Sequence, residues 1–152
     1  MAAETFRLEV ASPERMLVNE AVTEATIPGE QGYMGILPGH APLLSELGIG
    51  ELTYKLLNGQ MHVLAVAGGY LEISGNHVRV LAHGAEKAAE IDVKRATEAL
   101  KRATERIANP LPGVDVAKAL NAAKRAQARL DAAKYAGGVA DYRGVAGPGL
   151  EQ

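Results

Sequence analysis

Two arginines placed four residues apart stand out among the side chains able to bind a ligand. Arg125 and Arg129 fall in a stretch with helical apolar periodicity, so they share one face of a predicted helix. Asp92 and Arg95 stand at the start of an earlier helical stretch. In an antiparallel hairpin of the two helices, these four side chains can converge. Guanidinium groups bind phosphate in a planar, bidentate fashion, so a phosphate site is one interpretation and ordinary charge pairs on solvated helices are the other.

No catalytic or metal-binding motif is evident beside these arginines. Cysteine is absent, which excludes a disulfide framework, a thiolate nucleophile and a cysteine-based metal site. The four histidines, at positions 40, 62, 77 and 83, are scattered without the i, i+4 pairing of a helical zinc motif. A glycine-rich loop followed by Lys-Ser or Lys-Thr is also absent, so no P-loop is expected. We predict no catalytic residue and no metal ligand.

His40 lies in an unusual segment, Gly35–Leu44, which combines two prolines with apolar residues. Pro38-Gly39 predicts a tight turn, because proline presets φ at the first central position and glycine tolerates a positive φ at the second. Pro42 has no N–H to donate, so it belongs at a strand start or a sheet edge. The segment is either a stiff apolar projection that meets another protein or a loop that plugs the core. No serine or acid is spaced to form a triad with His40, which favours a turn or interface role for it.

Residues 1–85 are predicted to form an all-β domain. Apolar and polar residues alternate along Thr5–Val10, as in a half-buried strand. Turn signals recur every eight to twelve residues, which is typical of a sandwich or barrel of about eight to ten short strands. Asn58-Gly59 between two apolar runs predicts a hairpin with a type I′ turn, whose two central residues need a positive φ.

Residues 86–135 are predicted to form two helices joined by a tight connection. Apolar residues recur at spacings of three and four, and Asp92 and Asp115 stand where N-caps are expected. Asn109–Gly113 contains two prolines and a glycine and separates the helices. The second apolar stripe consists of Val116, Ala119, Ala123, Ala126, Leu130 and Ala133. The expected fold class is therefore α+β, an N-terminal β-sandwich followed by an antiparallel two-helix hairpin.

Alanine dominates the seams of this hairpin. Burial stabilises by roughly 25 cal/mol per Å² of apolar surface, so an alanine seam contributes much less than a leucine seam. We therefore expect the hairpin to be held weakly and to be able to rearrange. Beyond it, residues 136–152 are rich in glycine and alanine without an amphipathic pattern, and we expect a disordered tail there.

Charge is unevenly distributed along the 152 residues. Residues 1–85 hold four basic and nine acidic side chains, a net charge of −5, whereas residues 86–152 hold twelve basic and nine acidic, a net charge of +3. This difference suggests two segments with different partners. Aromatic residues are scarce, which argues against binding of single-stranded nucleic acid. No run of 18 apolar residues and no signal-peptide core is found, so we expect no membrane insertion and a cytoplasmic location.

Several segments resemble, in order, the epsilon subunit family of bacterial F-type ATP synthase. The matching segments are Gly35–Leu44 (GILPGHAPLL), Gly68–Ile73 (GGYLEI), Asn76–Ala82 (NHVRVLA), Ala85-Glu86 and the Ile-Asp-x-x-Arg-Ala motif of Ile91–Ala96. They cover the chain from residue 4 to about residue 135. The resemblance implies a sandwich of about ten strands over residues 1–85, a regulatory hairpin over residues 86–135, and a non-catalytic role.

A rotor role follows from the same resemblance. It implies a place in the central stalk, rotating with the gamma subunit and the c-subunit ring at the cytoplasmic face of the membrane. The residues that resemble ring-facing ones are Tyr33, Met34, His40 and Pro42. Some relatives have an acidic residue at the place of Tyr33, so the resemblance does not carry over a charged contact with the ring.

The hairpin of this family lies folded on the sandwich or extends towards the alpha and beta subunits, and the extended form opposes ATP hydrolysis. The balance of eleven basic and seven acidic residues over 86–135 suits an acidic partner surface. No cofactor is required, but ATP binds the folded hairpin of some members as a regulatory ligand. The matching residues here are Glu86, Ile91, Asp92, Arg95, Arg125 and Arg129.

Two other classes of function fit parts of the sequence. A free-standing β-sandwich that binds a small ligand agrees with residues 1–85 but leaves the charged hairpin without a purpose. An enzyme in its own right would need an acid–base or nucleophile set, which is not evident in the sequence.

Overall fold

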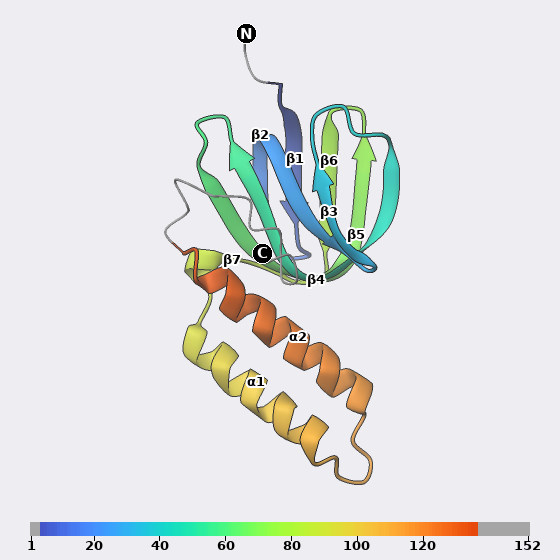
Figure 1. Ribbon diagram of the computed structural model, residues 1–152, viewed down its shortest axis with the longest axis vertical. Coiled ribbons are helices and arrows are strands. Elements are labelled where there is room, and N and C mark those ends of the chain that lie inside the picture. Colours follow the sequence, from blue (N-terminus) through green and yellow to red (C-terminus); the bar gives the residue numbers. More distant parts are fainter. Residues whose placement is uncertain (1–3, 137–152) are drawn as a thin grey trace, which may run out of the picture.

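The computed structural model describes residues 4–136, in which a β domain precedes two α-helices (Figure 1). The strands are β1 (Phe6–Ala11), β2 (Met16–Gly29), β3 (Gly32–Ile36), β4 (Leu43–Leu56), β5 (Met61–Ser74), β6 (His77–Ala82) and β7 (Ala85–Lys87). A 3-10 turn, η1 (Ala88–Glu90), leads to α1 (Val93–Ala108) and α2 (Val116–Ala133). The predicted α+β class is confirmed. The expected tail, residues 136–152, lies outside the described residues except for its first residue.

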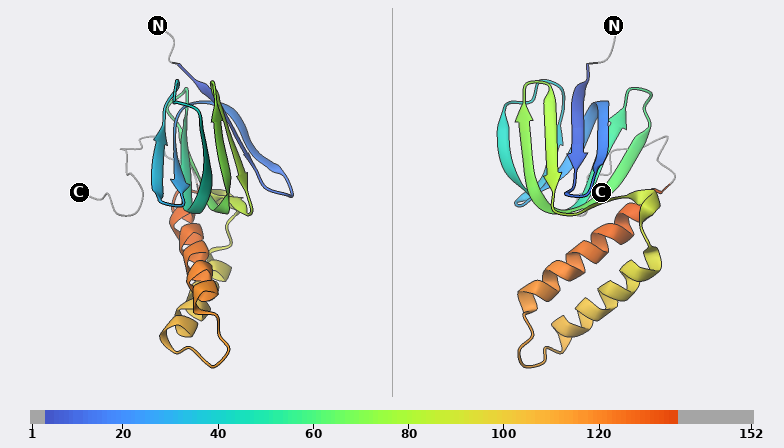
Figure 2. Two further views of the ribbon diagram at one scale, coloured as in Figure 1. Left: turned by 90° about the vertical axis from the view of Figure 1, so that its right-hand side faces the viewer. Right: turned by 180° about the vertical axis from the view of Figure 1, so that it is seen from behind.

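The strands form a sheet that closes on itself as a flattened sandwich. Strand order is β1-β6-β5-β4-β2-β3, and an additional pairing of β1 with β2 completes the ring. β1 and β6 are parallel, whereas the other pairs are antiparallel. Figure 2 shows the two facing layers edge-on, with the helices beyond one end of them.

The expectation of about ten strands was wrong, because residues 4–136 form seven. Three of them, β2, β4 and β5, are 14 residues long. The β4–β5 pairing keeps one register along its length, whereas the β2–β4 pairing shifts register between Thr26 and Gly29. Gly48 lies at the bend of β4, where a Cβ would be 2.5 Å from the carbonyl oxygen of Gly29. Gly68 and Gly69 lie inside β5 with positive φ values. Glycines that indicate strand ends in the sequence therefore mark bends within long strands.

The predicted β4–β5 hairpin is present, but its turn is not of type I′. The N–H of Gly59 donates to the carbonyl of Leu56 at 2.9 Å, and only Gly59 of this turn has a positive φ. Asn58 keeps a negative φ, and its side chain accepts the N–H of Gln60. A type I turn followed by a left-handed glycine satisfies the same Asn-Gly signal. The other predicted turn is confirmed, since the N–H of His40 donates to Leu37 and Gly39 has φ +83°.

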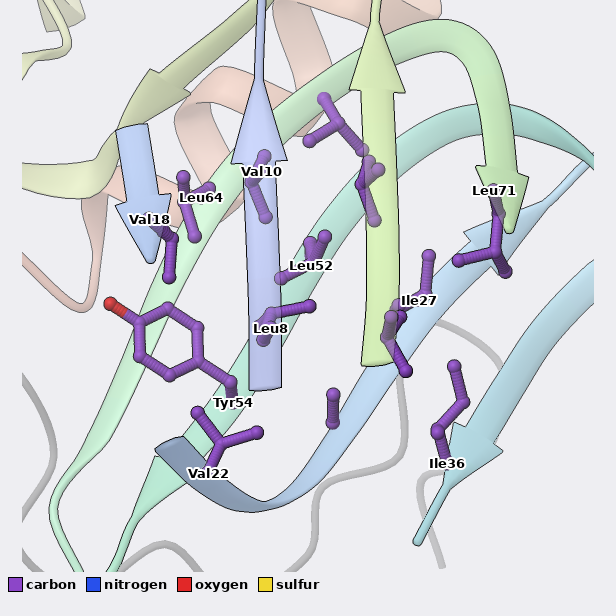
Figure 3. Packing of buried hydrophobic residues seen from close by; sticks show 14 of the residues in the cluster. Leu8, Val10, Val18, Val22, Ile27, Ile36, Leu52, Tyr54, Leu64 and Leu71 are labelled. Carbon is purple, nitrogen blue, oxygen red and sulfur yellow. The ribbon is translucent and has the colours of Figure 1, made fainter. Parts of the chain in front are cut away.

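The core lies between the two layers and follows the predicted alternation along the strands. Its side chains come from β1, β2, β3, β4, β5 and β6. Figure 3 labels ten of them, which belong to β1 to β5. The largest fully buried ones are Leu8, Ile27, Ile36, Leu52, Leu64 and Leu71. Leu8, Ile36 and Leu71 alternate with exposed or half-exposed neighbours, which is the expected pattern of a strand with one face inside. Leu64 instead lies between the buried Val63 and Ala65, because helix α2 covers the other face of β5 there. The core contains no residue of α1 or α2.

Candidate functional site

Helix α2 lies between helix α1 and the sandwich (Figures 1 and 2). Both helices begin where the sequence predicts, because the Asp92 side chain accepts the N–H of Arg95 and that of Asp115 accepts the N–H of Lys118. The predicted stripe of α2 contains the buried Ala119 and Ala126. At 100° per residue these two lie on the face opposite Ala128 and Ala132, which are also buried.

This second face of α2 docks on the sandwich. Ala128 and Ala132 pack in a small cluster with Val63 and Ala65 of β5 and with Ile91, which precedes α1. Ile49, Ala133 and Tyr135 complete the cluster at its edge. We call the sandwich part of this contact, Ile49, Val63 and Ala65, the docking platform. The α2 side of this contact consists of small alanine side chains, which bury little apolar area. That the hairpin is weakly held stays a prediction.

Arginines of α2 line a cavity beside the docking platform. The cavity has a volume of about 420 Å³ and is bounded by β5, the β6–β7 connection, β7 and α2. Arg125 and Arg129 contribute the positive charges, and Glu86 and Glu14 the negative ones. Nε of Arg129 donates to Oε1 of Glu86 at 2.6 Å. The volume is in the range of small-molecule sites, and we call this cavity the arginine pocket.

Three of the six predicted ATP-binding residues therefore meet at one cavity, namely Glu86, Arg125 and Arg129. The other three come from the start of α1. Ile91 is part of the docking cluster, and Asp92 is engaged as the N-cap of α1, with Oδ1 at 3.0 Å from the backbone N–H of Arg95. The side chain of Arg95 is exposed. The predicted convergence of the arginines is thus seen for the pair on α2, and not for Arg95 or Asp92 at this cavity.

Two residues of the arginine pocket carry no signal in the sequence. His83, in the β6–β7 connection, lines the pocket and packs edge-on against Tyr70, with ring centroids 6.5 Å apart. Glu14 belongs to the β1–β2 connection, far from the other pocket residues in the chain. The closure of the sheet brings both to this end of the sandwich. A search for side chains at helical spacing could not have found them.

An ion pair fixes the segment between sandwich and hairpin. Nη1 of Arg15 donates to Oε1 of Glu90 at 3.1 Å, and Nη2 bonds the other carboxylate oxygen. The guanidinium lowers the pKa of the Glu90 carboxyl below its ordinary value. This bidentate pair connects η1 to the β1–β2 connection.

The four residues predicted to face the c-ring do not form one cluster. His40 and Pro42 lie in the β3–β4 connection, at the end of the sandwich far from the helices (Figure 1). Leu37 and Leu44 flank them with 60% and 73% of their surface exposed. Tyr33 lies at the other end of β3, where its hydroxyl accepts the N–H of Glu51 at 3.1 Å.

Tyr33 also lines a hollow of about 670 Å³ that reaches Asn121 and Lys124 of α2. Burial raises the pKa of its hydroxyl. Met34 has the opposite orientation and packs against the sandwich core. In the docked arrangement, Tyr33 therefore faces the helical hairpin rather than the apolar turn that contains His40.

An exposed apolar row crosses the outer face of four strands. Tyr70 of β5 pairs with Leu81 of β6, Leu81 with Ala11 of β1, and Ala11 with Met16 of β2. Directly paired residues point to the same face of a sheet. Tyr70, Leu81 and Met16 each expose more than half of their surface. Contiguous exposed apolar residues are candidates for an interaction surface.

Residues 4–136 contain neither a metal-binding cluster nor a membrane-spanning helix. In that part of the chain, no three histidine, aspartate or glutamate side chains are grouped so as to hold a metal ion. Neither α1 nor α2 combines the length and the hydropathy that a membrane-spanning helix needs.

Comparison with known proteins identifies relatives over both parts of the fold. The ATP synthase epsilon chain of Solibacter usitatus (strain Ellin6076) is 56% identical over 127 residues, which cover 84% of this chain and 94% of that relative. The ATP synthase epsilon chain of Koribacter versatilis (strain Ellin345) is 48% identical over 105 residues, covering 69% and 73%.

Solved structures share the fold at lower identity. A chain of the Euglena gracilis mitochondrial ATP synthase (OSCP/F1/c-ring) aligns with a TM-score of 0.74 and 24% identity, over 86% of this chain and 81% of that one. A chain of the Tetrahymena thermophila mitochondrial ATP synthase (central stalk/c-ring) aligns with a TM-score of 0.52 and 14% identity, over 88% and 97%.

Family models cover almost all described residues. The β-sandwich domain of the ATP synthase delta/epsilon chain matches residues 5–88, and the long α-helix domain of the same chain matches residues 89–134. With two domain models matched in the expected order and relatives about half identical over most of their length, the chain belongs to the delta/epsilon family of ATP synthase subunits.

Proposed function

We propose that this epsilon-type chain is a non-catalytic rotor subunit of a bacterial F-type ATP synthase. It joins the gamma subunit to the c-subunit ring and so helps to couple proton-driven rotation to ATP synthesis. It works as a peripheral subunit at the cytoplasmic face of the inner membrane. Its helical hairpin regulates ATP hydrolysis, with ATP as a regulatory ligand.

The exposed apolar row supports attachment to gamma. Tyr70, Leu81, Ala11 and Met16 form a surface on which a partner can bury apolar area without any rearrangement of the sandwich. Leu81→Glu places a charge in the middle of this row and should abolish co-purification with gamma. Leu57→Glu, at an equally exposed position in the β4–β5 turn, is the matched control. Retention of gamma by Leu81→Glu would argue against this surface.

The apolar turn supports a contact with the c-ring. His40 and Pro42 stand between the exposed Leu37 and Leu44 on a stiff turn. Met34 and Tyr33 are less suited to this contact, since one packs on the core and the other faces α2. His40 and Pro42, with the two leucines, are therefore the residues proposed to meet the ring.

The docking of α2 is the observation that carries the regulatory proposal. Helix α2 contributes the small side chains of Ala128 and Ala132 to the contact with the sandwich, so its release uncovers little apolar surface on the helix itself. The released hairpin, with its excess of positive charge, suits an acidic surface on the alpha and beta subunits. Its inhibitory form is the released one and its permissive form is the docked one.

The arginine pocket supports ATP as the ligand of the docked form. Arg125 and Arg129 offer guanidinium groups for phosphates on a helix that forms this cavity only when docked. A ligand that binds only the docked state shifts the population towards it. ATP therefore opposes inhibition when it is abundant.

Hydrolysis by the reconstituted catalytic complex tests the regulatory role. The full chain should lower the hydrolysis rate, whereas a chain that ends after residue 88, and so keeps the whole sandwich, should bind gamma without lowering it. Equal rates with both chains would overturn the proposal. Because ATP is also the substrate, inhibition is expressed as the ratio of the rates with the full and the shortened chain at the same ATP concentration, and this ratio should approach one as ATP is raised.

A further inference from the structure

A carboxylate lies inside the docking platform of the hairpin. Glu51 of β4 pairs directly with Ala65 of β5, and Ile49 precedes it by two residues, so the three side chains share one face. Ile49 and Ala65 pack against the α2 cluster that contains Ala128 and Ala132. Glu51 is therefore half-buried in a surface that the docked helix covers. Thr53 and Glu86 are the other polar side chains on this face, because they pair with Val63 and Ala65, and Glu86 forms an ion pair with Arg129 of α2.

Charged and polar groups face Glu51 from β3 and from α2. On the β3 side, the Tyr33 hydroxyl accepts the backbone N–H of Glu51. On the α2 side, Asp131 brings a second carboxylate and Lys134 a cation. Nζ of Lys134 lies 3.5 Å from Oδ1 of Asp131 with 70% of its side chain exposed, and Gln127 donates to the same oxygen. Solvent screens a lysine in this position, so it compensates only part of the repulsion between the two carboxylates.

We propose that docking of helix α2 on the sandwich takes up a proton from solvent at the Glu51 carboxylate, so that acidification favours the docked hairpin. The inference rests on the proposed function, because it concerns the same docked and released states. It adds a pH dependence to the equilibrium between docked and released hairpin, which ATP binding at the arginine pocket does not supply.

The direction in which pH changes the docking of α2 follows from the surroundings of Glu51. Burial raises the pKa of its carboxyl, Asp131 raises it further, and Lys134 lowers it in part. Release of α2 removes the covering helix together with Asp131, so the released state binds the proton less tightly. The docked population therefore grows as the pH falls through the raised pKa, and it shrinks above it.

Hydrogen exchange of the α2 amides in the full chain measures this equilibrium. The protection factor, the ratio of the unprotected to the observed exchange rate at each pH, should increase on acidification from about pH 8 to about pH 5, by roughly tenfold for each unit of pKa change on docking. Glu51→Gln should show high protection that no longer depends on pH. Asp131→Asn should raise protection at neutral pH and reduce the slope.

Glu72→Gln is the matched control, because Glu72 lies exposed on β5 beyond the bend and away from α2. The Glu72→Gln variant should show the same pH dependence of α2 protection as the unmodified chain. A protection factor that is flat with pH in the unmodified chain, or an unchanged slope in Glu51→Gln, would overturn the inference. The proposed regulation is judged separately, by the effect of the hairpin on hydrolysis at one fixed pH, so each can fail without the other.

Discussion

Nε of Arg129 lies 2.6 Å from Oε1 of Glu86, and this single ion pair joins helix α2 to strand β7. The two side chains are about one-third exposed, so solvent screens their attraction. The pair stands at the rim of the arginine pocket. Arg129 therefore has two uses in the docked state, since it stabilises docking without a ligand and is available to phosphate with one.

The first prediction concerns this ion pair. Glu86→Gln removes the charge on β7 and should weaken docking by about 0.5–1 kcal/mol, the usual contribution of a partly exposed pair. Amide exchange of α2 should become faster by a corresponding factor, while the melting temperature of the sandwich changes little. Glu98→Gln, exposed on α1, is the control. Unchanged α2 exchange in Glu86→Gln would mean that the pair does not hold the helix.

The second prediction concerns ATP. Millimolar ATP should raise the melting temperature of the unmodified chain, because a ligand of the folded state stabilises it by mass action. Arg125→Ala should abolish the rise, as it removes one of the two pocket guanidinium groups. Lys118→Ala, exposed on the same helix, should retain it. If the unmodified chain shows no rise, ATP is not a ligand of this pocket.

Features that depend on neighbouring residues could be predicted from the sequence. Asp92 and Asp115 begin the helices as expected, since a cap bonds the backbone three residues ahead. The Pro38-Gly39 turn is likewise local. The Asn58-Gly59 signal predicted a hairpin correctly but not its turn type, because one left-handed glycine is enough for a type I turn with a bulge.

Features that depend on distant contacts could not be predicted. Ala128 and Ala132 form the docking face of α2, but alanine is too weakly hydrophobic to reveal a second apolar face beside the first. His83 and Glu14 reach the arginine pocket through sheet closure. The family resemblance groups Tyr33 and His40 together as ring-facing residues. They are seven positions apart, and the extended strand β3 between them places them at opposite ends of that strand.

The third prediction concerns the docking face. Ala132 is fully buried against the platform, so Ala132→Leu introduces atoms for which there is no space. Overpacking of this kind costs about 1–3 kcal/mol, and here it should release the hairpin without unfolding the sandwich. Loss of α2 amide protection, with the β amides unchanged, is the expected result. Ala117→Leu, exposed on α2, should leave both unchanged. Equal protection in the two variants would contradict the docking geometry.

The fourth prediction compares two glycines of the sandwich. Gly69 has φ +127°, and a Cβ there would clash with the carbonyl oxygen of Leu81. Gly69→Ala should therefore destabilise the chain by more than about 2 kcal/mol in urea unfolding, from backbone strain and the clash together. Gly35→Ala, where no atom lies within 4 Å of the new Cβ, should change stability by less than about 0.5 kcal/mol. Similar losses in both would argue against the bend of β5 at Gly69.

The fifth prediction concerns acid stability of the sandwich. Oε2 of Glu9 accepts from Nε2 of His77 at 2.8 Å and from Nε of Arg79 at 3.0 Å, and these bonds lower the pKa of the Glu9 carboxyl. A lowered pKa contributes stability above the ordinary carboxyl range, which is lost as the pH falls through the lowered value. The melting temperature of the sandwich should therefore fall less steeply below about pH 5 in Glu9→Gln than in the unmodified chain.

The acid destabilisation predicted for Glu9 has the opposite direction to the proton uptake proposed for Glu51. Acid should weaken the β1–β6 pairing at Glu9 while it strengthens docking of α2, because one carboxyl has a lowered pKa and the other a raised one. Sandwich amides and α2 amides should consequently respond to pH with opposite signs in the same exchange experiment. Glu98→Gln should leave both responses intact. A common direction for all amides would mean that global unfolding, rather than these two carboxyls, sets the pH dependence of the chain.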